Sequence, residues 1–233
     1  ECVAIVGQSG SGKTTLIQHF TGLLRPTRGT VAFDGRDIWA KGFKQSVLRR
    51  KIGLVFQFPE NQLFEETVEK DIAFGPKNFG LHEDEIEERI STAMQAVELS
   101  ESFRKRSPFR LSEGEKRRVA IAGVLAMQPD MLVFDEPTAG LDPHAVDLFI
   151  NIVKRLLLAQ KGVVIITHNM DFVAEVASRV VVLQQGAIAF DGSPQHLFGD
   201  ASMLQQAGLE YPTVVRSLRQ FEKPLPDVVR SAI

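Results

Sequence analysis

Short apolar runs alternate along the chain with longer stretches that are typical of helices. The runs are four or five residues long, and each predicts a buried strand. The predicted strands cover residues 2–6, 52–56, 131–134 and 163–167. The predicted helices cover residues 13–24, 83–99, 114–127, 144–160 and 170–177. Strands that alternate with helices in this way indicate an α/β fold with a mostly parallel central sheet.

Two further features complete the predicted secondary structure. Within residues 83–99, one helix face carries Ile86, Ile90, Met94 and Val97, and we expect that face to pack in the core. Turn signals predict two further features. Residues 30–33 and 36–38 around Asp34-Gly35 form a hairpin or a strand edge, and residues 180–183 pair with 187–190 in a hairpin around Gln185-Gly186.

The regular pattern weakens after about Gly192. Pro212, Pro224 and Pro226 punctuate the tail that follows. At roughly 150 residues per domain, 233 residues suggest one domain with an appendage. We therefore expect a main domain over residues 1–192 and a C-terminal appendage over residues 193–233.

Composition excludes several classes of protein. Apolar residues make up 44% and charged residues 24%, as in ordinary globular domains, which excludes wholesale disorder and a collagen-like chain. The net charge is −2, from 27 basic and 29 acidic residues, so broad nucleic-acid binding has no support. The single cysteine, Cys2, cannot form an internal disulfide and fits a reducing compartment. No apolar run approaches the roughly 20 residues of a membrane span.

The strongest chemical signal is a glycine-rich loop between a predicted strand and a predicted helix. Residues 7–14 read GQSGSGKT and match the phosphate-binding pattern G-x-x-x-x-G-K-[ST]. In such loops the backbone N–H groups turn toward a phosphate, the lysine reaches the β- and γ-phosphates, and the hydroxyl binds Mg²⁺. The sequence therefore predicts an ATP and Mg²⁺ site. The nucleotide-binding residues would be Gly7, Gln8, Ser9, Gly10, Ser11, Gly12, Lys13, Thr14 and Thr15.

Two carboxylates follow a later apolar run. Asp135 and Glu136 stand at the end of the strand predicted over residues 131–134. Asp135 is placed to hold Mg²⁺ opposite Thr14, and Glu136 is placed to orient or deprotonate an attacking water. A pair of acids after a strand is common at ordinary caps, but together with the phosphate-binding loop it predicts nucleotide hydrolysis.

A third motif identifies a family. Residues 111–115 read LSEGE, about 20 residues before Asp135, and resemble the L-S-G-G-Q signature of ABC-type ATPases. Gln57, Asp142 and His168 follow the second, third and fourth predicted strands, in the order that this family shows. The chain is identified by these motifs as resembling an ABC-type nucleotide-binding subunit over at least residues 1–192.

The resemblance implies a P-loop NTPase fold, a helical signature subdomain over about residues 64–128, and a role for each motif residue. Two such subunits would pair head to tail, as a homodimer or a heterodimer. Ser112 and Gly114 of one would bind the γ-phosphate of the other's ATP, and Asp142 would bridge the subunits. His168 would position water, while Gln57 would contact Mg²⁺ or that water. Glu136 would be the principal catalytic residue.

Two features depart from the family pattern. Glu113 replaces the first glycine of the signature pair, and Glu115 replaces its glutamine. Because carboxylates that face a γ-phosphate would repel it, we expect both to point away, and we expect this signature to form the weaker of two ATP sites. The family's adenine-stacking aromatic residue lies upstream of the first strand, and no candidate precedes Gly7. The chain opens at Glu1 inside an apolar run, so we expect that its natural start is missing.

The segment from Phe56 to Phe64 resembles the corresponding region in the ATPases of energy-coupling factor (ECF) importers and of their cobalt and nickel relatives. That resemblance implies a transmembrane coupling subunit, a small membrane protein that binds a vitamin or a metal ion, and a peripheral place on the cytoplasmic face of the membrane. We expect a groove near residues 57–64 to receive the coupling subunit, lined by Phe56, Phe58 and Phe64, with at least one of these buried in the core. The tail, including residues 208–218, resembles the segment through which such ATPases associate, or is an ordinary terminal helix pair.

Other functions stay open. The main alternative is a soluble ABC ATPase that acts on a macromolecular partner without transport. Ribosome- or DNA-directed members usually carry two cassettes or a long coiled-coil insertion, and the sequence shows neither. An exporter fragment would normally have fused membrane spans. An assembly or regulatory ATPase is distinguished only by its partners.

Overall fold

The computed structural model describes residues 1–221 and confirms the predicted α/β fold around a mostly parallel sheet. The sheet has six strands in the order β4-β5-β6-β1-β7-β8. Every neighbouring pair is parallel except β7 and β8, which are antiparallel. The strands are β1 (Cys2–Val6), β4 (Ile52–Val55), β5 (Met131–Asp135), β6 (Gly162–Ile166), β7 (Arg179–Gln184) and β8 (Ala187–Gly192). The predicted first hairpin forms a separate two-stranded sheet of β2 (Ala32–Phe33) and β3 (Arg36–Asp37).

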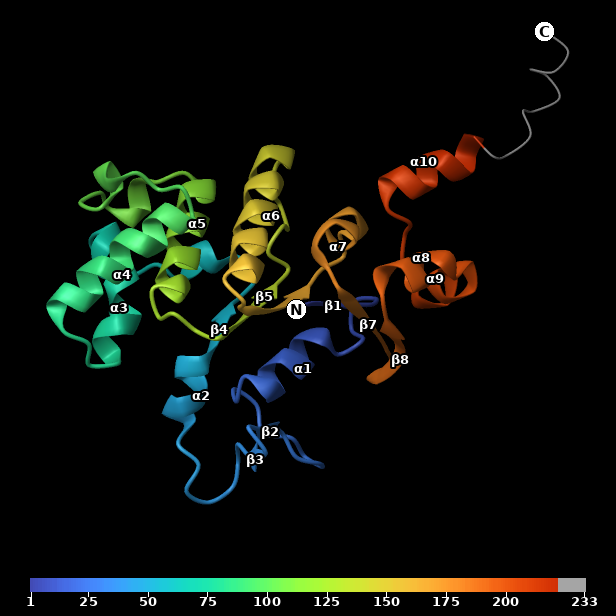
Figure 1. The fold of residues 1–233 in the computed structure, drawn as a ribbon, viewed down its shortest axis with the longest axis horizontal. Helices are drawn as coiled ribbons and strands as arrows, with labels where there is room; N and C mark the ends of the chain where they lie inside the picture. The colour runs from blue at the N-terminus through green and yellow to red at the C-terminus, as the bar shows by residue number, and fades with distance from the viewer. Residues whose placement is uncertain (222–233) are drawn as a thin grey trace, which may run out of the picture.

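Helices lie on both faces of the sheet and beyond its two ends. Figure 1 shows α3, α4 and α5 grouped at one end of the molecule and α8, α9 and α10 at the other. The helices of the first half are α1 (Lys13–Phe20), α2 (Gln45–Lys51), α3 (Val68–Asn78), α4 (Glu83–Ala96) and α5 (Glu113–Leu125). Those of the second half are α6 (Pro143–Leu158), α7 (Met170–Val176), α8 (Pro194–Gly199), α9 (Ala201–Ala207) and α10 (Thr213–Phe221). Three short 3₁₀ turns cover Pro59–Gln62, Glu101–Phe103 and Pro108–Arg110.

Side chains that alternate along β1 divide the core between the two faces of the sheet. Ile5 packs with Ile17 of α1 on one face. Ala4 and Val6 point to the other face, where α7, α8 and α9 contribute Val173, Leu197 and Leu204. A third and larger cluster joins α6 and the helices α3 to α5 to β5 and β6, and it includes the predicted stripe on α4. Each face of the sheet is thus covered.

Several predicted boundaries differ from the structure. The helix predicted over residues 13–24 ends at Phe20, because Gly22 adopts a left-handed conformation with φ of +73° and the chain turns there. No helix was predicted over α2 or α3, yet both form. α2 buries only Leu48, and α3 contains Pro76, so neither shows a clear apolar period. Such segments form helices because they pack against the rest of the fold.

The C-terminal segment packs on the sheet in part. Leu197 of α8 and Leu204 of α9 are fully buried against β7 and its neighbours. α10 follows Pro212 and is held to α7 through Thr213, whose N–H and hydroxyl donate to the Asp171 carboxylate at 2.6 and 2.7 Å. The part of the predicted appendage that contains Pro224 and Pro226 lies outside the described residues.

Candidate functional site

The glycine-rich loop joins the end of β1 to α1 at the carboxyl edge of the sheet. Gly7, Gly10 and Gly12 have φ of +142°, +79° and +101°, in the region that favours glycine. A Cβ at Gly7 would lie 2.2 Å from the Leu183 carbonyl oxygen, so that position has no room for a side chain. Gly12 caps α1 without a side chain, so the first N–H groups of the helix stay free for an anion.

Lys13 is held inside this loop. Its Nζ donates to the carbonyl oxygens of Gly7 at 2.8 Å and Gln8 at 2.9 Å, and only 7% of the residue is exposed. Burial lowers the pKa of Lys13, while the nearby carboxylates of Glu136 and Asp135 act in the opposite direction. The ammonium group is therefore desolvated and ready to exchange its carbonyl partners for phosphate oxygens.

The remaining loop residues also fit a phosphate site. Ser11 is buried, and within the described part of the chain its hydroxyl has no hydrogen-bond partner, as expected of a group that awaits a ligand. Gln8, Ser9 and Gly10 are exposed along the loop, as are Thr14 and Thr15 in the first turn of α1. Every residue predicted for the loop therefore lies in the turn between β1 and α1 or in the first turn of α1.

Thr14 and Asp135 come together from α1 and the tip of β5. The Thr14 hydroxyl donates to Asp135 Oδ2 at 3.3 Å. Burial raises the pKa of Asp135, and the hydrogen bond from Thr14 opposes that rise. A hydroxyl and a carboxylate oxygen beside a phosphate cradle are hard donors of the kind that Mg²⁺ takes together with phosphate oxygens and water. The residues present therefore fit the ion.

Glu136 and His168 form a second pair beside this one. His168 Nε2 lies 2.9 Å from Glu136 Oε1, although that oxygen is buried and accepts no hydrogen bond within the described residues. Burial raises the pKa of Glu136 to about 7, and partial burial lowers the pKa of His168. A carboxylate with a pKa near neutrality and a free lone pair has the properties of a general base. Glu136 also has a left-handed φ of +48°, a strained conformation that is often found at functional sites.

Parallel pairing explains why these residues meet. Val55 of β4 is opposite Phe134 of β5, and Asp135 is opposite Ile166 of β6. Gln57, Asp135 and His168 therefore leave neighbouring strands at the same edge, where ligands of open α/β sheets bind. Gln57 is exposed at that edge.

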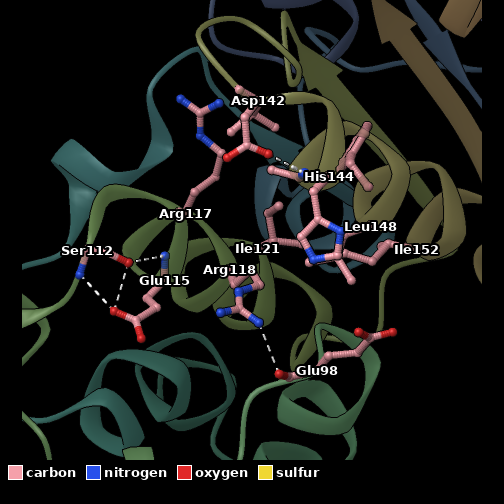
Figure 2. Close-up of a pocket in the computed structure, with 14 residues that line it drawn as sticks. Glu98, Ser112, Glu115, Arg117, Arg118, Ile121, Asp142, His144, Leu148 and Ile152 are labelled. Carbon is pink, nitrogen blue, oxygen red and sulfur yellow. Dashed lines mark hydrogen bonds between the residues drawn. The ribbon is translucent and has the colours of Figure 1, made fainter.

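The structure places the other predicted residues at a separate cavity. This cavity of about 210 Å³ lies between α5 and α6, and Figure 2 shows Ser112 and Asp142 on its wall. Gly114 also lines it. Ser112 is the N-cap of α5, and Asp142 caps α6 by accepting from the Ala145 N–H at 2.9 Å. One chain thus carries two distinct groups of motif residues, one around the loop and one around this cavity.

The expectation that both signature acids point away is wrong for Glu115. Its carboxylate Oε2 accepts from the N–H and the hydroxyl of Ser112, each at 2.8 Å. Glu113 does turn aside, to an ion pair of 2.7 Å with Lys116. The difference arises because the third residue of a helix can reach back to its N-cap, whereas the first cannot.

Sequence reasoning missed a buried ion pair that joins the two groups. Arg117 of α5 donates to both Glu60 carboxylate oxygens, at 3.1 and 2.9 Å, and their side chains are only 8% and 7% exposed. The same guanidinium donates to the Ala139 carbonyl, three residues beyond Glu136. Arg117 therefore ties the signature helix to the segments that follow β4 and β5. The only available signal was the motif around Gln57, which contains Glu60.

Replacing Arg117 with methionine is expected to destabilise the fold by about 3–5 kcal/mol, because Glu60 would keep an unpaired buried charge. Urea unfolding followed by circular dichroism measures the loss. Lys154→Met is the matched control, since Lys154 pairs with Glu175 in an exposed position and should cost less than about 1 kcal/mol. Equal losses in the two variants would contradict the role given to Arg117.

Comparisons with known proteins agree with this geometry. A family model described as ABC transporter matches residues 1–139. The energy-coupling factor transporter ATP-binding protein EcfA2 of Clostridium tetani is 49% identical over 225 residues, covering 96% of this chain and 78% of the relative. The EcfA2 protein of Caldanaerobacter subterraneus is 46% identical, covering 97% and 80%.

Two solved structures are similar as well. CbiO1 from Clostridium perfringens, described as part of the ABC transporter complex cbiONQ, aligns with a TM-score of 0.79 and 37% identity over 94% of this chain and 87% of that one. The ATP-binding cassette MJ0796, solved as a dimer bound to ADP and Pi, aligns with a TM-score of 0.73 and 30% identity over 83% and 85%. The chain therefore belongs to the ABC transporter family, in the branch of the energy-coupling factor transporter ATP-binding proteins, and it is an ATPase.

Proposed function

We propose that this ATPase powers an importer of the energy-coupling factor type, which carries a vitamin or a transition-metal ion such as cobalt or nickel. The observation that supports the hydrolytic part is the edge of the sheet where Lys13, Glu136 and His168 meet. The support for import comes from the relatives, which are named as energy-coupling factor transporter proteins and as part of an ABC transporter complex.

In the proposed reaction, the phosphates of ATP occupy the cradle of residues 7–15 and take over the hydrogen bonds of Lys13. Glu136 Oε1, which lies next to His168 Nε2, accepts the proton of an attacking water. His168 and Gln57 keep that water in line with the γ-phosphate. Thr14, Asp135 and Gln57 would hold Mg²⁺, which when bound neutralises charge that develops on the β- and γ-phosphates.

The second group of motif residues supports a pair of ATPases. Ser112 and Gly114 line a cavity apart from the chain's own phosphate-binding loop, so they are placed to complete the ATP site of another ATPase rather than that of their own chain. Asp142 would bridge the two subunits. MJ0796 was solved as a dimer, which agrees with such a pairing. The partner is a second copy or a different ATPase with the same fold.

A groove supports a membrane partner. It has a volume of about 630 Å³ and lies between α2, β4 and α3, with Phe56 and Phe74 on its walls. Of the three phenylalanines expected along a groove near residues 57–64, Phe56 lines this one. Phe58 lies beside Arg117, and Phe64 packs edge-to-face against Phe74. None of the three predicted phenylalanines is fully buried. An apolar groove of this size suits a helix of a transmembrane coupling subunit.

Among the described residues, no helix is both long and apolar enough to cross a membrane. The relatives are named as energy-coupling factor transporter ATP-binding proteins, and this supports a peripheral place on the cytoplasmic face of the membrane. The partners there would be the coupling subunit and a small membrane component that binds the substrate.

Affinity purification of the natural subunit from its own membranes in mild detergent, followed by mass spectrometry, tests the proposal. Recovery of a polytopic coupling protein with a small membrane protein would support import, and the ligand of the small protein would name the substrate. Recovery of ribosomal, DNA-bound or only soluble partners would contradict it and favour an ABC ATPase that acts on a macromolecular partner.

A further inference from the structure

The start of α5 contains a closed hydrogen-bonded ring between Ser112 and Glu115. The Glu115 carboxylate accepts from the N–H and the hydroxyl of Ser112, and the Ser112 hydroxyl oxygen in turn accepts from the Glu115 N–H at 3.3 Å. Figure 2 shows the two side chains linked at the cavity wall. Both residues belong to the signature, so the ring lies where the proposed function places the partner's γ-phosphate.

The hydrogen bonds of this ring determine whether Ser112 has a proton available for a phosphate. A serine hydroxyl has one proton to donate, and here that proton already points to a carboxylate oxygen. The same carboxylate takes the Ser112 N–H and lies at the positive end of the α5 dipole. These hydrogen bonds lower the pKa of Glu115, so the group is a full anion at neutral pH. Ser112 therefore already binds one anion before any nucleotide arrives.

The Glu115 carboxylate has a second position available to it, beside Arg118. Its side chain borders the cavity of about 210 Å³, and Arg118 lies on the same wall one helical turn later. The Arg118 guanidinium donates to the Glu98 carbonyl oxygen at 3.0 Å, and no carboxylate is bonded to it among the described residues. Residues three apart on a helix are neighbours, so a carboxylate released from Ser112 can pair with Arg118.

We propose that Glu115 is an internal competitor of the partner's ATP, because it occupies Ser112 until the γ-phosphate displaces it toward Arg118. This proposal rests on the proposed pairing of two ATPases. It has a direct consequence for that pair. An ATP site completed by this signature closes at a higher ATP concentration than one completed by a signature with a neutral residue in place of Glu115.

A glutamine at position 115 separates the competitor from an ordinary helix cap. Its amide can donate to the Ser112 hydroxyl oxygen, which frees the serine proton for the phosphate, and it carries no charge. A cap that only stabilises α5 predicts a lower melting temperature and no gain in ATP response. If Glu115 is a competitor, the glutamine variant closes at a lower ATP concentration, whether or not its melting temperature changes.

The experiment uses the full-length subunit with its natural ATPase partner, and it measures ATP-dependent closure by energy transfer between dyes on the two subunits. Glu115→Gln is expected to lower the ATP concentration for half-maximal closure on the order of tenfold, since it removes a hydrogen bond to a charged group. Glu113→Gln is the matched control. It removes one negative charge from the same helix end, yet Glu113 contacts Lys116 and not Ser112, so the half-maximal concentration should change less than about twofold.

Three outcomes would overturn the inference. They are no shift for Glu115→Gln, an equal shift for both variants, and a higher ATP requirement for Glu115→Gln. In each of them the unaltered pair still closes with ATP, so the proposed function survives. If the unaltered pair fails to close or hydrolyse ATP at all, the proposed pairing falls and takes this inference with it.

Discussion

Replacing Glu136 with glutamine is expected to leave ATP binding intact while lowering the hydrolysis rate by about 10²–10⁴-fold, the usual contribution of a general base. The side chain keeps its shape and its place beside His168, but the amide cannot accept the proton of water at the position where Oε1 now lies. Because partial burial raises the pKa of Glu136 to about 7, the change also removes a group that is poised to take a proton near neutrality.

The same substitution should hold the ATPase pair closed. ATP would bind both half-sites, and without hydrolysis the γ-phosphate would continue to join them. Steady-state phosphate release measures the rate, and size-exclusion chromatography with ATP measures the closed pair. Asp130→Asn is the matched control, since Asp130 is exposed just before β5 and pairs with Lys51. Hydrolysis by Glu136→Gln at the rate of the control would contradict the assignment of the base.

The sequence predicted those parts of the site that lie close together along the chain. The loop from Gly7 to Thr14 and the acids Asp135 and Glu136 each follow an apolar run, and the strand order then brings them to one edge. The spacing of these residues predicts their positions, because a strand followed by a tight turn leaves the backbone few other conformations.

Contacts between distant segments were not predictable from the sequence. Arg117 and Glu60 are 57 residues apart and meet only when α5 packs beside the turn that follows β4. α3 was missed for a related reason, since Gly75 and Pro76 interrupt its pattern and burial of Val68 and Ile72 against α5 holds it. The direction of Glu115 was predicted wrongly, although a serine followed three residues later by a glutamate is itself a signal for a capping box.

The ion pairs and helix caps around the signature also connect it to other segments of the chain. Ser112 is bound by Glu115, and Arg117 ties the same helix to Glu60 and to the Ala139 carbonyl. One buried guanidinium therefore links the signature helix to the segments that follow β4 and β5, and these segments leave the sheet at the edge where hydrolysis is proposed.

Replacing Lys13 with alanine is expected to abolish ATP binding, with the dissociation constant raised at least about 10²-fold, because two or more charge-assisted hydrogen bonds to phosphate are lost. The fold should survive. The hydrogen bonds of the Lys13 ammonium group go to the carbonyl oxygens of Gly7 and Gln8 in its own loop, so no ion pair with a hydrogen bond is broken. Removing the positive charge should raise the pKa of the nearby carboxyls of Asp135 and Glu136, which Lys13 now lowers. Thermal melting checks that point.

Titration with a fluorescent ATP analogue measures the binding loss. Lys154→Ala is the matched control, because this lysine is exposed on α6 and pairs with Glu175 on the neighbouring helix α7. The control should bind the analogue as the unaltered protein does. Undiminished binding by Lys13→Ala would show that the loop is not the phosphate cradle. Weak binding by Lys13→Ala with an unchanged melting temperature would locate the loss in the contact between ammonium and phosphate. That contact exists only when nucleotide is bound. In the free protein the Lys13 ammonium group is buried before its ligand arrives, and this burial costs free energy because the charge loses contact with water.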